Sequence, residues 1–290
     1  MADHPRFGPA GVPPKFRLLK ATLAEVPQLL CEEGLDALEY EAVRWGKKPQ
    51  IKKQDATTLG QKAKEKDIWL SLHGSYFINL SGEKTIREAS KQRLIACATA
   101  GEWMQAHTVV FHPGFYGIKA HSEALNTCIK TLKEVQEALT STGINNIKLG
   151  PETMGRRQQL GTLDEILTIC ETLEQTQPVI DWSHLHAREM GKLRTTDDYR
   201  NVITQIENRL GTEATNNLHC HFTKIEYTLK GEKRHHTLKE KTYGPNFTHL
   251  AKIIAEQNLK PVIISESPLL DIDAIQMRNI LKQQQESYLR

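Results

Sequence analysis

The feature that most constrains the fold of this chain is the regular alternation of short β-rich runs with longer stretches of helical periodicity. Apolar stripes mark two of the helical stretches, at residues 162–173 and 197–210, and a capping box of Thr162 and Glu165 opens the first. Strands that alternate with helices of this length predict βαβ units and a parallel sheet. The β-rich runs are RFGPAG or the adjacent KFRLLK, then DALEYEAV, IWLSLHGS, TVVFHPG, IKLGPET, PVIDWSHLH, NLHCHFTKI and PVIISESP.

Eight such units in 290 residues, without a break in composition, predict an α/β protein. We expect one closed (β/α)8 barrel, a TIM barrel, as a single domain over residues 1–290. An open, doubly wound sheet is the competing architecture. No glycine-rich phosphate loop follows the first strand, and the internal strands are short, so the closed barrel is favoured.

The composition limits the classes of protein to which the chain can belong. With 39% hydrophobic and 25% charged residues it is typical of globular proteins, and a net charge of +3 leaves nucleic-acid binding to local patches. Five cysteines, none in CxxC spacing, favour a reducing compartment and argue against a zinc ribbon. We find neither a signal-peptide core nor a membrane-spanning run, so we expect a cytoplasmic protein without a membrane partner.

Polar side chains end one apolar run after another. They are His73, His112, Glu152, Asp181, His184, His219 and Glu266. Singly, each could be a hydrogen-bonded histidine, a helix cap or half of a salt bridge. The carboxyl ends of barrel strands converge, however, and clustered buried carboxylates repel unless a cation neutralises them. Mixed imidazole and carboxylate ligands suit zinc, with manganese or iron as alternatives, and their number predicts two or three ions at the C-terminal face of the strands.

The residues around these positions resemble a known family. The segments SLHGSYFINL, FHPG, PETMG, IDWSH, LHCHFTK, RHHTL and ISESP resemble, in order and spacing, the motifs of endonuclease IV, over about residues 68 to 268. The resemblance implies a metal-dependent apurinic/apyrimidinic endonuclease on a (β/α)8 barrel with a trinuclear zinc site. The N-terminal stretch RFGPAGVPPKF does not match the family's usual opening strand.

The resemblance also implies the role of each ligand. His73 and His112 would hold one metal and share Glu152 as a bridge, and Glu152 would lie nearest the attacking water as the catalytic residue. The second metal would be held by Asp181, His219 and Glu266 together with Glu152. The third metal would be held by His184 and His235.

The chain departs from the family at the third metal. The family has an Asp-Arg-His-His run there, whereas this chain has Lys233 in place of the aspartate. A lysine ammonium has no free lone pair, and its charge opposes the metal. Either Glu232 supplies the oxygen through a loop shift, or His186 or His221 substitutes, or the third site is empty or weaker. Two further departures are Phe222, where the family usually has a polar or acidic residue, and the more basic loop GRRQQLG. With these changes the sequence does not determine the substrate.

Several individual residues are predicted to contact DNA. By the resemblance, Tyr76 falls where a wedge enters the duplex at the lesion, and Arg44 or Trp45 would serve similarly. The alternative for Tyr76 is simple packing on a loop. Arg156, Arg157 and Lys224 lie in loops on the same barrel face and would meet phosphates, or would be solvated surface charges.

Three functions compete. The first is a DNA-repair hydrolase of base excision repair, which nicks double-stranded DNA 5′ to abasic sites and acts as a monomer. The second is a sugar isomerase or epimerase, which would use a smaller set at Glu152, Asp181, His219 and Glu266 and leave the other histidines without a role. The third is a nucleic-acid-binding relative that has lost nuclease activity.

Overall fold

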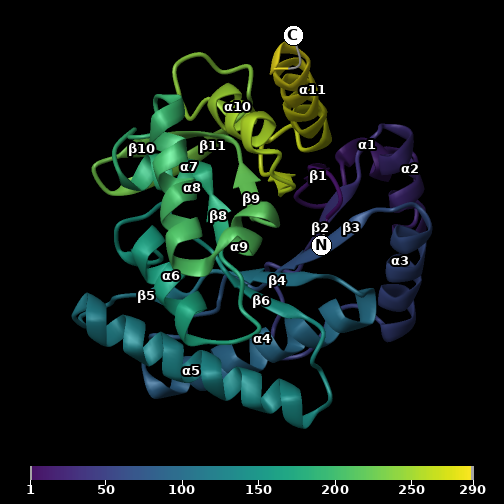
Figure 1. The fold of residues 1–290 in the computed structure, drawn as a ribbon. Coiled ribbons are helices and arrows are strands. Elements are labelled where there is room, and N and C mark those ends of the chain that lie inside the picture. The colour runs from purple at the N-terminus through teal and green to yellow at the C-terminus, as the bar shows by residue number, and fades with distance from the viewer. Residues whose placement is uncertain (1, 289–290) are drawn as a thin grey trace.

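Eight parallel strands form a closed barrel in the structure, a computed structural model that describes residues 2–288 (Figure 1). They are β1 (Arg6–Pro9), β2 (Ala37–Glu41), β3 (Trp69–His73), β4 (Thr108–Phe111), β6 (Lys148–Pro151), β8 (Val179–Asp181), β9 (His219–Phe222) and β12 (Val262–Ser265). They pair in the orders β1-β12-β9-β8 and β2-β3-β4-β6, and every pairing is parallel. Parallel bridges from Ala10 to Glu39 and from Glu152 to Val179 join these two sheets. The predicted (β/α)8 barrel is therefore confirmed.

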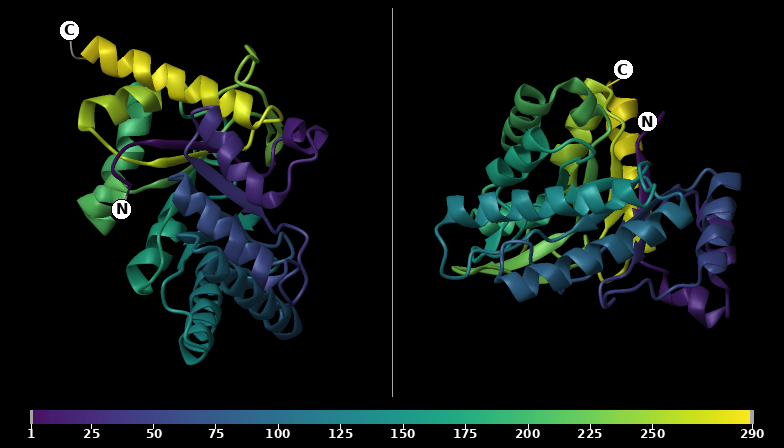
Figure 2. Two further views of the ribbon diagram at one scale, coloured as in Figure 1. Left: turned by 90° about the vertical axis from the view of Figure 1, so that its right-hand side faces the viewer. Right: turned by 90° about the horizontal axis from the view of Figure 1, so that it is seen from below.

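Helices surround the strands, as the two further views show (Figure 2). They are α1 (Pro14–Leu18), a 3-10 turn at Leu23–Glu25, α2 (Val26–Glu32), α3 (Lys53–Glu65), α4 (Lys84–Met104), α5 (His121–Ser141), α6 (Leu163–Thr172), α7 (Trp182–Arg188), α8 (Thr196–Leu210), α9 (Thr212–Asn216), α10 (Phe247–Gln257) and α11 (Asp271–Tyr288). The predicted capping box at α6 is present, because the Thr162 hydroxyl accepts the N–H of Glu165 and Glu165 accepts that of Thr162. Such a box satisfies N–H groups that the helix itself leaves free.

The first strand is the RFGPAG alternative, and the KFRLLK alternative is wrong because α1 occupies it. Pro14 starts α1 at a position where a missing N–H does no harm. Gly8 lets β1 approach β2 closely, since a Cβ there would lie 1.9 Å from the carbonyl oxygen of Ala37. The side chain of Asp36 also accepts the N–H of Phe7 at 2.7 Å. These contacts fix the strand at residues 6–9.

Two predicted strands are shorter than expected. In PVIDWSHLH the strand ends at Asp181, because its carboxylate caps α7 by accepting N–H groups from the first turn at 2.7 and 2.8 Å. The run NLHCHFTKI divides into β9 and β10 (Lys224–Thr228). β10 pairs with β11 (Gly231–His236) as an antiparallel hairpin outside the barrel. A second short antiparallel pair joins β5 (Gly114–Phe115) to β7 (Gln159–Leu160).

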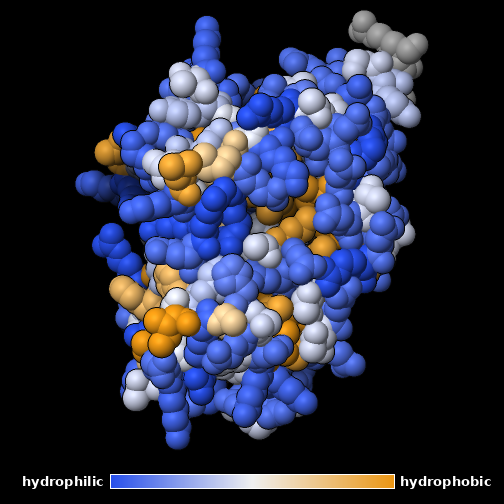
Figure 3. Space-filling model, turned by 90° about the vertical axis from the view of Figure 1, so that its left-hand side faces the viewer, coloured by the Kyte–Doolittle hydropathy of each residue, from blue (hydrophilic) through white to orange (hydrophobic). Residues whose placement is uncertain are grey.

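The apolar side chains gather in one large cluster between the strands and the helices, with Leu72, Phe111 and Trp182 among its fully buried members. The face drawn in Figure 3 is mainly hydrophilic, with apolar groups in separate patches. Among residues 2–288, no helix combines the length and the apolar character needed to cross a membrane.

Candidate metal centre

Glu152, the residue after β6, is the centre of the polar cluster at the carboxyl end of the barrel. Its side chain is fully buried. Oε2 lies 3.4 Å from Nε2 of His73 and 3.2 Å from Nε2 of His112. Oε1 lies 3.2 Å from Nδ1 of both His184 and His221. One carboxylate thus faces four imidazoles that come from four separate segments of the barrel.

His73, His112 and Glu152 form the first group of potential ligands. His73 is the last residue of β3, and its Nδ1 lies 3.0 Å from the carbonyl oxygen of Gly74. A proton on Nδ1 satisfies that carbonyl and leaves the Nε2 lone pair toward Glu152. His112 directly follows β4, the neighbouring strand. The structure brings together all three residues that were expected here.

Glu152, Asp181, His221 and Glu266 form the second group. Nδ1 of His221 lies 3.2 Å from Oε1 of Glu266 as well as from Glu152. Asp181 uses Oδ1 to cap α7, so Oδ2 is left buried without a hydrogen bond from residues 2–288. Three carboxylates meeting one imidazole form a group that a divalent cation would neutralise.

His219, which was expected in the second group, lies elsewhere, and His221 occupies its expected place. In the parallel pairing of β8 with β9, His221 is level with Asp181, whereas His219 is level with Val179. The two histidines share a face of β9 but are about 6.6 Å apart along it. Only His221 is near enough to the strand end, and Nε2 of His219 instead lies 3.1 Å from Oε2 of Glu39.

His184, Glu232 and His235 form the third group. Nε2 of His184 lies 3.6 Å from Oε2 of Glu232, and Nε2 of His235 lies 4.0 Å from Oε1 of the same carboxylate. Nδ1 of His184 is 2.9 Å from the carbonyl oxygen of Thr153, which orients the ring. The three side chains come from α7 and from β11, so the hairpin supplies two of the three potential ligands.

A β-bulge explains why Lys233 does not occupy this group. Across the hairpin, Glu226 pairs with Arg234 and Tyr227 pairs with Glu232, so Lys233 is the extra residue between them. A bulge of one residue shifts the following side chains to the other face of a strand. Glu232 consequently joins His184 and His235, and Lys233 is exposed, with Nζ 2.5 Å from Oε1 of Glu226.

The alternative substitute His186 does not join the third group. It lies on α7 two residues after His184, and its ring packs edge-on against Tyr227 with centroids 5.6 Å apart. Its Nε2 also lies against Gly244, where a Cβ would come within 2.8 Å. His236, the neighbour of His235, stacks on Tyr243 instead. Glu232 and His221 are thus the two substitutes that the structure brings into ligand groups.

The charges in the cluster are strongly coupled. Burial opposes protonation of His73, but the carboxylate of Glu152, which lies 3.4 Å from its Nε2, and the charge of Glu41 outweigh this and raise its pKa to about 10. Burial raises the pKa of Asp181 to about 6. Burial also disfavours the charge on Glu152, but His221 and the other imidazoles hold its pKa well below the usual range. Without a cation, histidine protons therefore supply the positive charge that these buried carboxylates require.

The donor set fits a transition-metal cluster. Three buried ligand atoms have no hydrogen-bond partner among residues 2–288: Nε2 of His73, Oε2 of Glu152 and Oδ2 of Asp181. Neighbouring ligand atoms in the three groups are 3.2 to 3.6 Å apart at their nearest. Zinc bonds of about 2.0–2.1 Å at tetrahedral angles separate ligands by roughly 3.3 Å. Imidazole and carboxylate donors without thiolate suit zinc, manganese or iron.

The comparisons with known proteins agree with the barrel fold. The family described as "Xylose isomerase-like TIM barrel" matches residues 27–286. The chain belongs to this family. An uncharacterized protein of Methanocaldococcus jannaschii, MJ0133, is 31% identical over 272 residues, which are 93% of this chain and 94% of that protein.

Two solved structures have a fold similar to that of this chain. Endonuclease IV from Thermus thermophilus has a TM-score of 0.69 at 17% identity, over 96% of this chain and 100% of that one. A D-tagatose 3-epimerase-like protein has a TM-score of 0.66 at 19% identity, over 92% and 97%. At these identities the likeness establishes the shared fold.

Tyr76 is an exposed aromatic residue in contact with the first group. Its side chain is 51% exposed, and its ring stacks on His112 with centroids 5.1 Å apart. It also meets His73 edge-on at 5.3 Å. Tyr76 therefore covers the first group from the solvent side, a position from which it could contact a bound substrate.

Arg44 and Trp45, the two residues weighed for a similar role, differ in exposure. Arg44 is exposed, whereas Trp45 is only 5% exposed and packs edge-on against Tyr40 at 5.9 Å. The carbonyl of Trp45 also accepts the hydroxyl of Ser75 at 2.8 Å. The expectation that Trp45 contacts DNA is corrected, because a buried indole in the core cannot reach a duplex. Arg44 remains a candidate.

Basic residues lie around the third group. Arg156 and Arg157 are exposed in the loop after β6, and Nε of Arg156 is 4.0 Å from Oε2 of Glu232. Arg188 holds this loop by donating to the carbonyl of Arg156 at 2.6 Å. Lys224 is half-buried, and its ammonium donates to a backbone carbonyl at residue 240. The two arginines are therefore freer than Lys224 to meet a phosphate.

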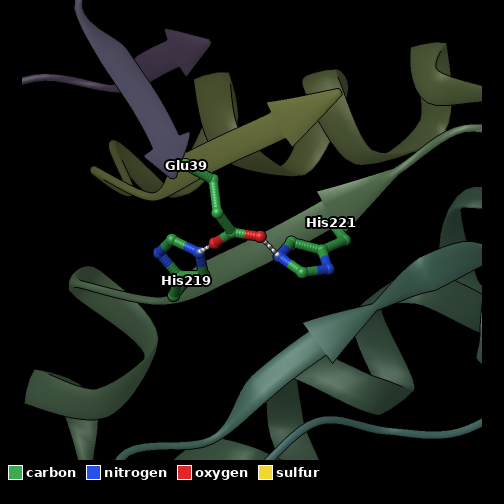
Figure 4. A group of neighbouring side chains, drawn as sticks. All are labelled: Glu39, His219 and His221. Atoms are coloured by element: carbon green, nitrogen blue, oxygen red, sulfur yellow. Dashed lines mark hydrogen bonds and ion pairs between the residues drawn. The ribbon is translucent and has the colours of Figure 1, made fainter. Parts of the chain in front are cut away.

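Glu39 is the polar residue that the sequence interpretation missed. It lies in β2, fully buried, with His219 and His221 on either side of its carboxylate (Figure 4). The run DALEYEAV held a signal, because alternation along a strand puts Glu39 and Glu41 on the same face. The other face carries Leu38 and Tyr40, so the two glutamates would have been expected to point into the barrel.

Proposed function

We propose that this protein is a metal-dependent endonuclease that cleaves DNA 5′ to abasic sites, with two or three zinc ions held at the carboxyl end of its barrel. The observation that carries the proposal is the third ligand group of His184, Glu232 and His235, next to the two groups that share Glu152. Three adjacent groups suit the displacement of a phosphodiester, in which charge develops on several oxygens at once.

The ligand count favours this function over an epimerase. A barrel epimerase would use a single group such as Glu152, Asp181, His221 and Glu266, which is present here. That function leaves His73, His112, His184 and His235 without a role. Their Nδ1 or Nε2 atoms nevertheless face carboxylates at 3.2 to 3.7 Å. The epimerase stays the second candidate on the strength of the four-residue group.

The cations and the residues around them would have separate roles in the cleavage of the phosphodiester. Bound cations would lower the pKa of a water and neutralise the phosphate oxygens. Glu152, ionised at neutral pH, would orient that water toward phosphorus. The water oxygen would form a bond to phosphorus and give up a proton as the phosphorus–O3′ bond breaks. The 3′ oxygen would take up a proton, and the phosphate would stay on the abasic side. Tyr76 would pack at the lesion, and Arg44, Arg156 and Arg157 would bind backbone phosphates.

A nicking assay tests the proposal. Wild-type protein with zinc or manganese should nick a duplex with one abasic site and leave the matched undamaged duplex intact. Glu152→Gln should lose at least ~100-fold of this activity, because the carboxylate shared by two ligand groups and needed to orient the water is removed. Glu137→Gln, at an exposed position of α5, is the matched control and should retain it. If wild type fails to nick with every metal tried, the proposal is wrong. Ketose epimerisation, followed by NMR, would then support the second candidate, and duplex binding without nicking would support a non-catalytic relative.

A further inference from the structure

Glu39 lies beneath the second ligand group, inside the barrel, and holds two histidines at once (Figure 4). Its Oε1 lies 3.0 Å from Nε2 of His221, and its Oε2 lies 3.1 Å from Nε2 of His219. Ser71 of β3 also donates its hydroxyl to Oε2 at 2.8 Å. All four side chains are fully buried. The carboxylate is thus fixed in place and has one oxygen for each histidine.

The contacts continue from Glu39 toward the other end of the barrel. Nδ1 of His219 lies 3.1 Å from Nε2 of His107, and Nδ1 of His107 lies 2.5 Å from the carbonyl oxygen of Leu70. Contacts of 2.5, 3.1 and 3.1 Å therefore connect a backbone carbonyl of β3 to His107, His107 to His219, and His219 to Glu39. This continuous chain of contacts reaches from the strand backbone to the second ligand group.

Glu39 also belongs to two further groups of potential ligands, one with His219 and His221 and one with His73 and Glu266. Its existing contacts favour a supporting role over that of a ligand. Its two carboxylate oxygens already face the imidazoles of His221 and His219 at 3.0 and 3.1 Å. Oε2 already accepts the Ser71 hydroxyl. His221 could bind a second cation through Nε2 only if its ring lost both protons. These atoms therefore make direct polar contacts with one another.

Nε2 of His221 depends on Glu39. Nε2 of His221 and Oε1 of Glu39 are both buried without a hydrogen bond from residues 2–288, and they face each other as an ion pair at 3.0 Å. On the opposite side of the ring, Nδ1 faces Glu152 and Glu266. A carboxylate on the far nitrogen of a metal-binding imidazole fixes which nitrogen faces the metal and makes that nitrogen a better donor.

We propose that Glu39 is a positioning residue: by holding Nε2 of His221, it directs Nδ1 at the cation bound with Glu152, Asp181 and Glu266. The His107–His219 pair keeps Glu39 in place, so His219 acts as an anchor and not as a ligand. This inference rests on the metal centre of the proposed function, and its test measures metal binding without any DNA substrate.

The variant Glu39→Gln tests the inference, because it keeps the size of the side chain and removes its charge. A titration of the metal-depleted protein with zinc, in competition with a chromophoric chelator, resolves the affinity of each ion. We expect one ion to bind about 10- to 100-fold more weakly and the others to be unchanged. Cobalt substituted for that ion should show an altered visible spectrum. His221→Ala should weaken the same ion, and the double variant should add little beyond His221→Ala.

Two further variants keep the test decisive. Glu165→Gln removes another buried carboxylate, one held by Tyr116 away from the ligand groups, and should leave all zinc affinities unchanged. Ser71→Ala removes only a hydrogen bond to Glu39 and should weaken the same ion by a smaller factor. If Glu39→Gln does not fold, the zinc affinities of Ser71→Ala test the positioning role of Glu39.

The outcomes separate this inference from the proposed function. If wild type binds zinc and Glu39→Gln or Ser71→Ala leaves every affinity unchanged, the inference is overturned and the metal centre stands. If wild type binds no transition metal, both are overturned. If wild type binds zinc but does not nick DNA, the inference is tested as before and only the proposed activity is overturned.

Discussion

Nζ of Lys233 lies 2.5 Å from Oε1 of Glu226, on the outer side of the β10–β11 hairpin. The preceding residue, Glu232, instead has Oε2 3.6 Å from Nε2 of His184. The β-bulge at Lys233 separates these two neighbours and sends one to solvent and the other to the third ligand group. A lysine where the resemblance to endonuclease IV predicts an aspartate therefore leaves the third group of potential ligands intact. The aspartate's place is taken by a glutamate one residue earlier, whose longer side chain reaches the histidines.

Substitutions at these two positions should have different effects on metal content. Glu232→Gln removes the only carboxylate of the third group, so we expect zinc bound after dialysis to fall by one equivalent. Lys233→Gln, one residue later, should leave the zinc content unchanged because its side chain points to solvent. Elemental analysis of the dialysed proteins measures both. Equal losses in the two variants would contradict the bulge as the cause.

Much of the fold was predictable, because hydrophobic periodicity along the chain reports which faces are buried. The ligand types were predictable for a similar reason, since polar residues at the ends of parallel strands must converge. The choice between His219 and His221 was not, because it depends on how β9 is staggered against β8. That register arises from packing between strands distant in the sequence.

Buried residues near the site were the other source of error. Trp45 follows an exposed arginine after β2, and its sequence neighbours do not reveal that it packs on Tyr40. Glu39 was missed because a charged residue inside a strand is usually exposed, and only its partners His219 and His221 make its burial tolerable. Both cases depend on contacts that only the folded barrel creates.

Replacing Trp45 should change stability and not DNA recognition. Trp45→Ala leaves a cavity against Tyr40 and should lower the free energy of unfolding by about 3–5 kcal/mol. Arg44→Ala, at the exposed neighbouring position, should change stability by less than about 0.5 kcal/mol and weaken DNA binding instead. Urea denaturation and duplex titration of the two variants measure these effects. A stable Trp45→Ala protein with a specific binding defect would restore Trp45 as a DNA contact.

Tyr76 should affect DNA binding without affecting the metals. Tyr76→Ala removes an exposed ring that stacks on His112, and loss of one stacking contact with a base should weaken abasic-duplex binding by about 1–3 kcal/mol. Tyr76→Phe keeps the ring and should bind nearly as wild type does. Duplex titrations with zinc content measured in parallel distinguish the two effects. A loss of zinc in Tyr76→Ala would show that the ring mainly supports His112.

Metal binding should strengthen as the pH rises from about 6 to about 10. Without a cation, the pKa of His73 is raised to about 10 and that of Asp181 to about 6, so both must lose protons before they can bind zinc. Each displaced proton makes the apparent affinity about tenfold stronger per pH unit, and the rise should end above about pH 10. Competition titrations across this range measure the slope, which His73→Gln should reduce between about pH 7 and 10. An affinity that does not change with pH would contradict the protonated state of His73.

The same proton has the opposite effect on the metal-free fold. Because the pKa of His73 is raised on folding, its contribution to stability is complete below about pH 6.5 and is lost as the pH rises through about 10. With a chelator present, the melting temperature should therefore fall between about pH 7 and 10, and His73→Gln should flatten this fall. With zinc bound, the cation replaces the proton as the partner of Glu152, so the melting temperature should hold or rise over the same range.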